Sequence, residues 1–265
     1  MDNGTKGEKM SDHAYGWLPQ LPDPRDFRYT PRPFALGPLP ERIDLREDSS
    51  MPPVYDQGRL GSCTANAIAG AFEWILGKEM YPQFTPSRLA IYWGERVIEH
   101  STRVDSGAFI RDGFKVIQKR GVAPESEWPY DISKFTRAPS RTFWKHAKKH
   151  VATAYTALEV MPTAIQQALV GYDPVVIGFS VFSSFESDQT ARTGWVAQPE
   201  VSSEQVLGGH AILIVGYFQH NGMLYFVVRN SWGSDWGDKG YCYMPASYIA
   251  NPQFASDAWC LQVVK

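Results

Sequence analysis

Cysteine, an excess of either charge and long hydrophobic runs are all scarce in this sequence of 265 residues. The 3 cysteines are too few for a disulfide framework, and their odd number leaves at least one free thiol, which fits a reducing compartment. A net charge of −2 creates no overall field that attracts nucleic acid or an anionic membrane. The apolar runs are far shorter than a membrane span, and residues 1–13 lack the hydrophobic stretch of a secretory signal. We therefore expect a soluble protein without a nucleic-acid or membrane partner, cytoplasmic by default or exported by a route other than Sec.

Two pairs of residues have alternative interpretations. Cys242 and Cys260 lie in strand-like segments and could form a disulfide, but two buried thiols acting as small hydrophobic side chains are the favoured interpretation. His146 and His150 stand four residues apart in a basic stretch and could share a metal. Because no third ligand is near in sequence, the solvated face of a helix is favoured, and we predict neither a metal nor an organic cofactor.

Seven prolines lie between Trp17 and Pro40. They fix φ and remove N–H donors too often for a helix or a central strand, so this stretch is predicted to be extended. We call residues 1–38 the arm and treat them as an N-terminal, proline-rich extension.

Residues 39–150 have the pattern of helices. Ser62 is suited to cap a helix that begins with Cys63, in which apolar residues repeat every three or four positions. Thr85 is predicted to cap a second helix, and a third is expected near residues 108–120.

Residues 151–265 are rich in β-branched and aromatic residues punctuated by turn signals such as Asn221-Gly222. This half should be mainly antiparallel sheet. A helical half followed by a strand-rich half predicts an α+β protein with two lobes, and ligand sites favour the crevice between such lobes.

Cys63 stands in the first turn of its predicted helix. Free N–H groups and the positive end of the helix dipole there favour a thiolate over a thiol. Upstream, Gln57 precedes a loop in which Gly58 and Gly61 allow tight turns, so its amide could return to the helix start. With the backbone N–H of Cys63 it would form a two-donor oxyanion hole. Taken singly, the two residues would be a small buried side chain and a solvated loop residue.

Two further candidates lie at strand ends. His210 opens an apolar strand after two glycines, and the pKa range of imidazole suits a proton carrier. Asn230 ends the following strand, and a hairpin through residues 219–222 would bring both to the same end, where the amide can accept from the imidazole N–H. Nucleophile, base and orienting amide form a set suited to nucleophilic catalysis.

In this order, Gln57, Cys63, His210 and Asn230 resemble the oxyanion glutamine, nucleophile, histidine and asparagine of the papain family of cysteine peptidases. The most specific stretch is NSWGSDWGDKGY, and the resemblance covers most of the chain after the arm. Around the nucleophile the family signature is C-G-[SA]-C-[WY], whereas this chain has Leu60 in place of the first cysteine, which removes the usual disulfide partner.

The resemblance implies a papain-like two-lobed α+β fold. Residues 39–150 would form a helical lobe and residues 151–265 an antiparallel, β-barrel-like lobe, with the active-site cleft between them. The implied activity is hydrolysis of a peptide or protein substrate through a thioester on Cys63, with His210 as general acid and base.

The resemblance also implies residues that bind substrate. Trp232 should shield the histidine–asparagine hydrogen bond from water, and Trp236 should line the leaving-group side of the cleft. Gly107 would offer its backbone to an extended peptide. The pocket for the residue two before the cut would be lined by Phe109, Gly178 and Ala211, which predicts a hydrophobic substrate side chain there.

Other functions compete with this interpretation. The chain could be a non-catalytic papain-like binding module, although every catalytic position holds the active residue type. It could also be another thiol acyl transferase or an amidase, which commonly use an aspartate as orienter, or it could ligate rather than hydrolyse. Asn230 and Gln57 favour the peptidase.

The arm has two interpretations of equal weight. It carries Trp17, Phe27, Tyr29 and Phe34, and it could pack along the body and over the cleft as a regulatory strap. It could instead be a mobile tail or lie on the back of the β lobe.

Overall fold

The computed structural model describes residues 13–264. Its α-helices are α1 (Cys63–Lys78), α2 (Arg88–Ile98), α3 (Ile110–Lys119), α4 (Arg141–Ala147), α5 (Pro162–Val170), α6 (Asp188–Thr193) and α7 (Ala246–Ile249). The strands are β1 (Arg42–Asp44), β2 (Ala152–Leu158), β3 (Val175–Phe182), β4 (Val206–His220), β5 (Met223–Arg229), β6 (Tyr241–Pro245) and β7 (Ala255–Val264). Single 3-10 turns are η1 (Pro33–Leu36), η2 (Leu45–Glu47), η3 (Ile132–Lys134) and η4 (Ser183–Glu186).

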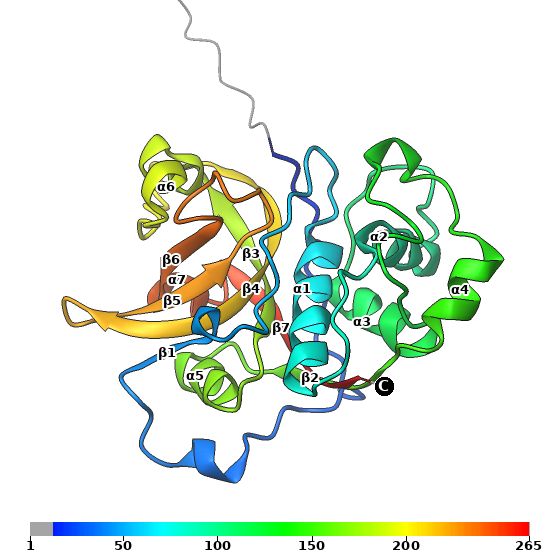
Figure 1. Ribbon diagram of the computed structural model, residues 1–265. Coiled ribbons are helices and arrows are strands. Elements are labelled where there is room, and N and C mark those ends of the chain that lie inside the picture. Colours follow the sequence, from blue (N-terminus) through cyan, green and yellow to red (C-terminus); the bar gives the residue numbers. More distant parts are fainter. Residues whose placement is uncertain (1–12, 265) are drawn as a thin grey trace, which may run out of the picture.

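The strands form one antiparallel sheet, which lies beside α1 to α4 (Figure 1). Their order is β2-β7-β3-β4-β5-β6, and β1 pairs with β4 off this path. Within the described residues the two end strands, β2 and β6, do not pair with each other, so the sheet is open and not a closed barrel. The predicted α+β class is confirmed.

The hairpin between β4 and β5 turns where the sequence predicts. His220 pairs with Met223, and both turn residues have left-handed backbone, with φ 50° at Asn221 and 75° at Gly222. An Asn-Gly pair suits such a turn because its twist matches that of the flanking strands. The hairpin returns β5 along β4, so that Asn230 follows directly on the end of β5.

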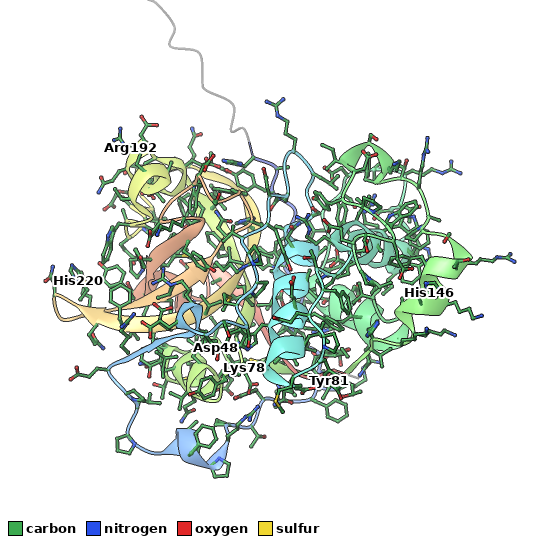
Figure 2. The ribbon with its side chains drawn as sticks, in the orientation of Figure 1. Asp48, Lys78, Tyr81, His146, Arg192 and His220 are labelled. Carbon is green, nitrogen blue, oxygen red and sulfur yellow. The ribbon has the colours of Figure 1, made fainter. Side chains whose placement is uncertain are left out.

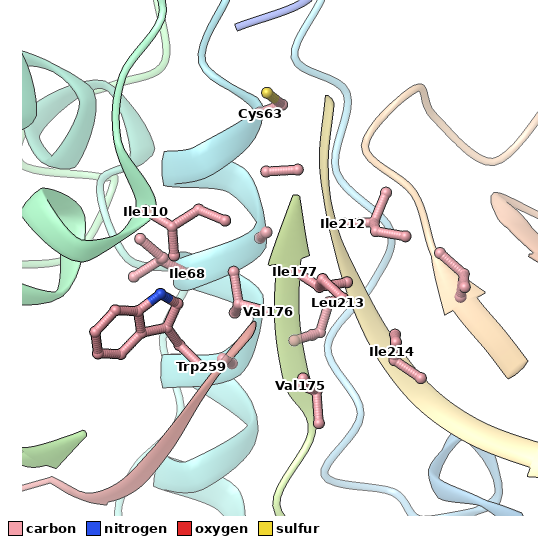
Figure 3. Close-up of a cluster of buried hydrophobic side chains, with 14 of the residues drawn as sticks. Cys63, Ile68, Ile110, Val175, Val176, Ile177, Ile212, Leu213, Ile214 and Trp259 are labelled. Atoms are coloured by element: carbon pink, nitrogen blue, oxygen red, sulfur yellow. The ribbon is translucent and has the colours of Figure 1, made fainter. Parts of the chain in front are cut away.

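Helix α1 lies between the sheet and helices α2 and α3. All its side chains from Cys63 to Leu76 are buried. Figure 3 shows Cys63 at one end of α1, with Val176 of β3 beside the helix. Leu213 of β4 also packs on α1, since a Cβ on Gly70 would lie 3.3 Å from its Cδ2. Close packing requires small residues here, since a Cβ on Gly70 would lie 2.7 Å from Nη1 of Arg229. The nucleophile candidate therefore stands at the end of a helix fixed on several sides by packed side chains.

The start of α1 is not capped as the sequence predicts. Ser62 occupies the cap position, but its hydroxyl makes no capping bond. That hydroxyl instead pairs with the hydroxyl of Tyr130 at 2.5 Å and accepts from Nδ2 of Asn66 at 3.1 Å. A tertiary contact thus replaces the local one.

The start of α2 also differs from the prediction. Pro86 pairs with Pro124 in an isolated bridge, and Glu125 donates its N–H to the carbonyl of Thr85 at 2.8 Å. These contacts hold Thr85 in extended chain, so Ser87 caps the helix instead, its hydroxyl accepting from the N–H of Ala90 at 3.3 Å.

Lys78, at the end of α1, forms an ion pair with Asp48 at 2.9 Å, and Figure 2 labels both residues.

The alternative interpretations of the cysteine and histidine pairs can be compared with the structure. Cys242 and Cys260 are free and buried, which confirms the favoured interpretation over a disulfide. His146, on α4, has its Nδ1 2.6 Å from Oε2 of Glu127. Within residues 13–264 no helix combines the length and apolar character needed to cross a bilayer.

Candidate active site

Cys63 is the first residue of α1 and its side chain is 0% exposed. Burial raises the pKa of the thiol to about 12, although backbone hydrogen bonds from Ala211 and Gly16 lower it in part. The sequence predicts an acidic thiol at a helix start, and the difference arises because desolvation outweighs the helix dipole. Part of what covers the sulfur is the arm, since Gly16 belongs to it.

His210 and Asn230 meet at the end of the β4–β5 hairpin. Nε2 of His210 lies 2.8 Å from Oδ1 of Asn230, which also accepts the N–H of Ser231 at 2.8 Å. The imidazole is 0% exposed, and burial lowers the pKa of His210 to about 4 even though the Asn230 bond raises it. Nδ1 of His210 has no hydrogen-bond partner among the described residues, so this nitrogen is left for a reacting group.

Two tryptophans cover the imidazole. The ring of Trp232 stacks on His210 with 5.0 Å between centroids and 28° between planes. Trp236 meets Trp232 edge-on at 5.1 Å. Both indoles are buried.

The side chain of Gln57 is buried and held at both ends. Its Oε1 accepts the hydroxyl of Ser231 at 2.6 Å, which fixes the orientation of the amide. Its Nε2 donates to the carbonyl oxygen of Leu60 at 2.9 Å and to that of Ala14, in the arm, at 3.0 Å. An amide donor of Gln57 therefore already binds a carbonyl oxygen that another segment of the chain brings to the site.

The arm crosses between the helical side and the sheet side of the site, as its dark-blue segment shows in Figure 1. On the helical side, Gly16 accepts the N–H of Ala108 at 2.7 Å and Leu18 donates to the carbonyl of Ala108 at 3.1 Å. On the sheet side, Trp17 donates its N–H to the carbonyl of Gly209 at 2.9 Å. The arm is thus bound through its backbone from both sides, as an extended peptide would be.

Glycines make this close approach sterically feasible. A Cβ on Gly16 would lie 1.8 Å from the carbonyl oxygen of Gly61, and one on Gly209 would lie 2.4 Å from the carbonyl oxygen of Trp17. A Cβ on Gly107 would lie 2.4 Å from the carbonyl oxygen of Gly16, but the backbone hydrogen bonds to the arm come from the neighbouring residue, Ala108. No larger residue fits these positions while the arm is in place.

The side chain of Trp17 fills a pocket and is 6% exposed. Of the predicted pocket residues, Gly178 faces the ring, since a Cβ there would lie 2.0 Å from Cε2 of Trp17. Ala211 contacts Cys63 through its backbone, and Phe109 precedes α3, with its N–H donating to Glu99 at 2.9 Å. The indole N–H donates to Oδ2 of Asp257 at 3.2 Å.

The residues before Trp17 cover the imidazole side. His13 stacks on Trp232 with 4.0 Å between centroids and 3° between planes. Tyr15 meets His210 edge-on, and its hydroxyl donates to Glu186. Together with Gly16 these residues exclude solvent from both Cys63 and His210.

Beyond Trp17 the arm continues along the back of the sheet. Tyr29 donates its N–H to the carbonyl of Ala157 of β2 at 2.8 Å, and Ala157 donates its own N–H to the carbonyl of Phe27 at 2.8 Å. The hydroxyl of Tyr29 donates to Asp173 at 2.8 Å. The arm therefore combines both interpretations: it crosses the site and then follows the β side of the molecule. Phe27 and Phe34 are 81% and 61% exposed, so these aromatic rings do not pack on the body as the strap hypothesis assumes.

Sequence reasoning missed several residues that shape the site. Ser231 and Asp257 fix the Gln57 amide and the Trp17 indole, and Ala14 supplies the carbonyl that Gln57 binds. Ser231 lies inside the NSWG stretch, which was a usable signal. Asp257 is the one charged residue of its strand, which could have marked it as having a role other than core packing.

Comparison with known proteins gives one consistent result. A family model described as papain family cysteine protease matches residues 39–260. An uncharacterized peptidase C1-like protein of Acanthamoeba polyphaga mimivirus is 40% identical over 94% of this chain and 87% of its own length. Digestive cysteine proteinase 1 of Homarus americanus is 28% identical over 88% of this chain and 72% of its own. The crystal structure of xylellain, a cysteine protease from Xylella fastidiosa, matches with a TM-score of 0.88 and 38% identity, covering 98% of this chain and 100% of that chain.

Proposed function

Since the chain belongs to the papain family of cysteine proteases, we propose that it hydrolyses peptide bonds through a thioester on Cys63 and that its arm keeps it latent. The observation that carries the proposal is the contact between Gln57 and the carbonyl oxygen of Ala14. A donor that already binds a peptide carbonyl beside a cysteine and an oriented histidine is arranged for acyl transfer.

The reaction would use each residue in one role. The Cys63 thiolate attacks the substrate carbonyl carbon, and the oxyanion accepts hydrogen bonds from Nε2 of Gln57 and from the backbone N–H of Cys63. His210, oriented by Asn230, protonates the leaving amine as the C–N bond breaks. A water molecule then loses a proton to His210, attacks the thioester, and releases the acid and the thiol.

Latency follows from what faces the sulfur. The arm presents the N–H of Gly16 to Cys63, and an N–H group is no electrophile. Under the arm the thiol and imidazole are both held neutral, because burial raises the pKa of Cys63 and lowers that of His210. Withdrawal of the arm would readmit solvent and relieve both shifts.

A direct test is to incubate a peptide library with the full chain carrying Gly16→Leu, a change for which the seated arm leaves no space, and to identify the products by mass. An added amine should not alter the products if the reaction is hydrolysis. Products joined to the amine would identify an acyl transferase, and an unchanged library would contradict the proposed peptidase.

Replacing Gln57 by alanine in the same Gly16→Leu chain should lower kcat by a factor of roughly 10² to 10³, because one of two oxyanion donors is lost. Steady-state kinetics on one peptide measure the change. The matched control is Gln83→Ala, which removes another glutamine that donates to backbone carbonyls, in a partly exposed position away from the site. Equal kcat values for the two variants would contradict the role of Gln57.

The latency of the unaltered chain should depend on pH. In the closed site, burial lowers the pKa of His210 from 6.5 to about 4. The neutral imidazole therefore stabilises the seated arm fully above pH 6.5, and this stabilisation is lost as the pH falls toward 4. The fraction of open chains, measured as the rate at which iodoacetamide alkylates Cys63 divided by the rate for Gly16→Leu at the same pH, should therefore rise on the order of tenfold between pH 7 and pH 5. Quenched time points analysed by intact mass give that rate.

Two comparisons make the pH experiment specific. Gly16→Leu, whose site is already open, supplies the intrinsic alkylation rate of Cys63 at each pH and so separates thiolate formation from opening of the arm. Burial also raises the pKa of Asp257, which favours closure as pH falls, so Asp257→Asn should enlarge the rise. A ratio to the Gly16→Leu rate that stays constant between pH 7 and pH 5 would count against control by the arm.

A further inference from the structure

The pocket that holds Trp17 ends in a carboxylate. Oδ2 of Asp257 accepts the indole N–H at 3.2 Å and also the backbone N–H of Gln20 at 2.8 Å. Both donors belong to the arm. When the arm withdraws, this oxygen loses both of them, and whichever side chain enters the pocket determines whether it is paired again.

The backbone of β7 is shaped to present this carboxylate. Gly178 of β3 pairs with Ser256 and Val176 pairs with Trp259, so two residues of β7 oppose one residue of β3. Such a bulge redirects a side chain. Asp257 lies in it with φ 57°, in the left-handed region that aspartate and asparagine adopt more readily than most residues.

The pocket wall on the β3 side is equally specific. Because Gly178 has no side chain, the face of a large planar ring can lie against the backbone of β3. A Cβ on Gly209 would also come within 2.9 Å of Cε3 of Trp17. Two glycines and one carboxylate thus enclose a bicyclic ring that has an N–H at its far edge.

Other charges near Asp257 favour a neutral donor over a cation. Arg111 of α3 lowers the pKa of Asp257, and Asp26 of the arm raises it. Arg111 is paired with Asp26 at 2.7 Å while the arm is seated. Once Asp26 leaves with the arm, the positive charge of Arg111 remains close to the pocket and disfavours a second cation there.

We propose that Asp257 is a specificity-determining residue of this peptidase and that the Trp17 pocket selects a bulky substrate side chain with an N–H donor at its far end, tryptophan above all. The inference rests on the proposed peptidase function and refines the apolar pocket predicted for the residue two before the cut. The arm holds the pocket with the same group that the substrate would bring.

The test compares two substrates that differ in one group. In the full chain with Gly16→Leu, kcat/KM is measured for a peptide with tryptophan two residues before the cut and for its benzothienylalanine analogue, in which sulfur replaces the indole N–H. The tryptophan peptide should be favoured about tenfold, because a site built to bind a donor is left unpaired by the analogue.

Variants of Asp257 test whether its carboxylate causes the preference for the tryptophan peptide. Asp257→Asn keeps an accepting oxygen without the charge and should leave a twofold to threefold ratio, and Asp257→Gly, which also tolerates left-handed backbone, should bring the ratio to about one. The control is Asp173→Asn, a buried carboxylate that binds the arm through Tyr29 and should leave the ratio at its tenfold value. A tenfold ratio that survives in Asp257→Gly would overturn the proposal, as would equal rates for both peptides in the Gly16→Leu chain.

A second measurement needs no turnover. In the chain with an unaltered Gly16, Trp17→Phe removes the indole donor with one ring of the bicycle, and Asp257→Gly removes the acceptor that the indole shares with the N–H of Gln20. Each should speed alkylation of Cys63 about tenfold, and the double variant should be clearly slower than the product of the two single effects. Multiplied rates in the double variant would contradict the pairing. If this coupling is found but no peptide is cleaved, the peptidase proposal fails and the pocket's preference for a donor stands. If both peptides are cleaved with equal kcat/KM, only the inference about Asp257 fails.

Discussion

Replacing Cys63 by alanine is expected to lower peptide hydrolysis by a factor on the order of 10⁴ or more, because no other group in the proposed reaction can form the thioester. The measurement is kcat/KM in the Gly16→Leu chain with and without the change. Since the Cys63 side chain is small and buried, its removal leaves little space, and the fold should persist.

Cys242→Ala is the matched control for the Cys63 change, because it removes another buried thiol, on β6. This control should retain most of the activity. If the Cys63 variant keeps a rate comparable to that of the control while both retain their near-ultraviolet circular dichroism, the assignment of Cys63 as nucleophile is contradicted.

Replacing Gly16 by leucine is expected to raise the rate of peptide hydrolysis by the full chain on the order of 10². A Cβ at this position would lie 1.8 Å from a backbone oxygen, that of Gly61, so the arm cannot remain seated. The arm then loses the burial of Trp17 and its backbone bonds to both sides of the site. Because an occupied site binds no substrate, the gain equals the inverse of the open fraction in the unaltered chain.

Gly37→Leu is the control for arm opening. It introduces the same side chain in the same arm, at a position where the nearest atom to a new Cβ is 4.0 Å away. Rates should match those of the unaltered chain. A rate increase in Gly37→Leu as large as in Gly16→Leu would show that the leucine acts otherwise than by unseating the arm from the cleft.

The parts of the site that could be predicted from sequence depend on local geometry. A helix start at Cys63 and an Asn-Gly turn between two strands are encoded by neighbouring residues, and they are enough to bring His210 and Asn230 together. The α+β class follows from the change of pattern along the chain.

The path of the arm could not be predicted because proline content indicates an extended chain but not the surface it lies on. That surface depends on glycines far apart in sequence, such as Gly61 and Gly209, which acquire meaning only when the fold brings them together. The raised pKa of Cys63 has the same origin, since the helix start alone predicts the opposite direction.

Asp257 escaped prediction for a related reason. Its orientation depends on a bulge, which arises from the pairing of β7 with β3 and not from the residues next to Asp257. The caps of α1 and α2 differ from prediction because Tyr130 binds the Ser62 hydroxyl and because Thr85 and Pro86 are paired in extended chain. In each case a contact between distant residues overrides a local preference.

The most direct test of a latent cysteine peptidase is intact-protein mass spectrometry after treatment with an epoxide inhibitor of papain-family enzymes. We predict one adduct on the Gly16→Leu chain, slow labelling of the unaltered chain near pH 7, and no adduct when Cys63→Ala is added to Gly16→Leu. An unlabelled Gly16→Leu chain, or an adduct that persists without Cys63, would contradict the account.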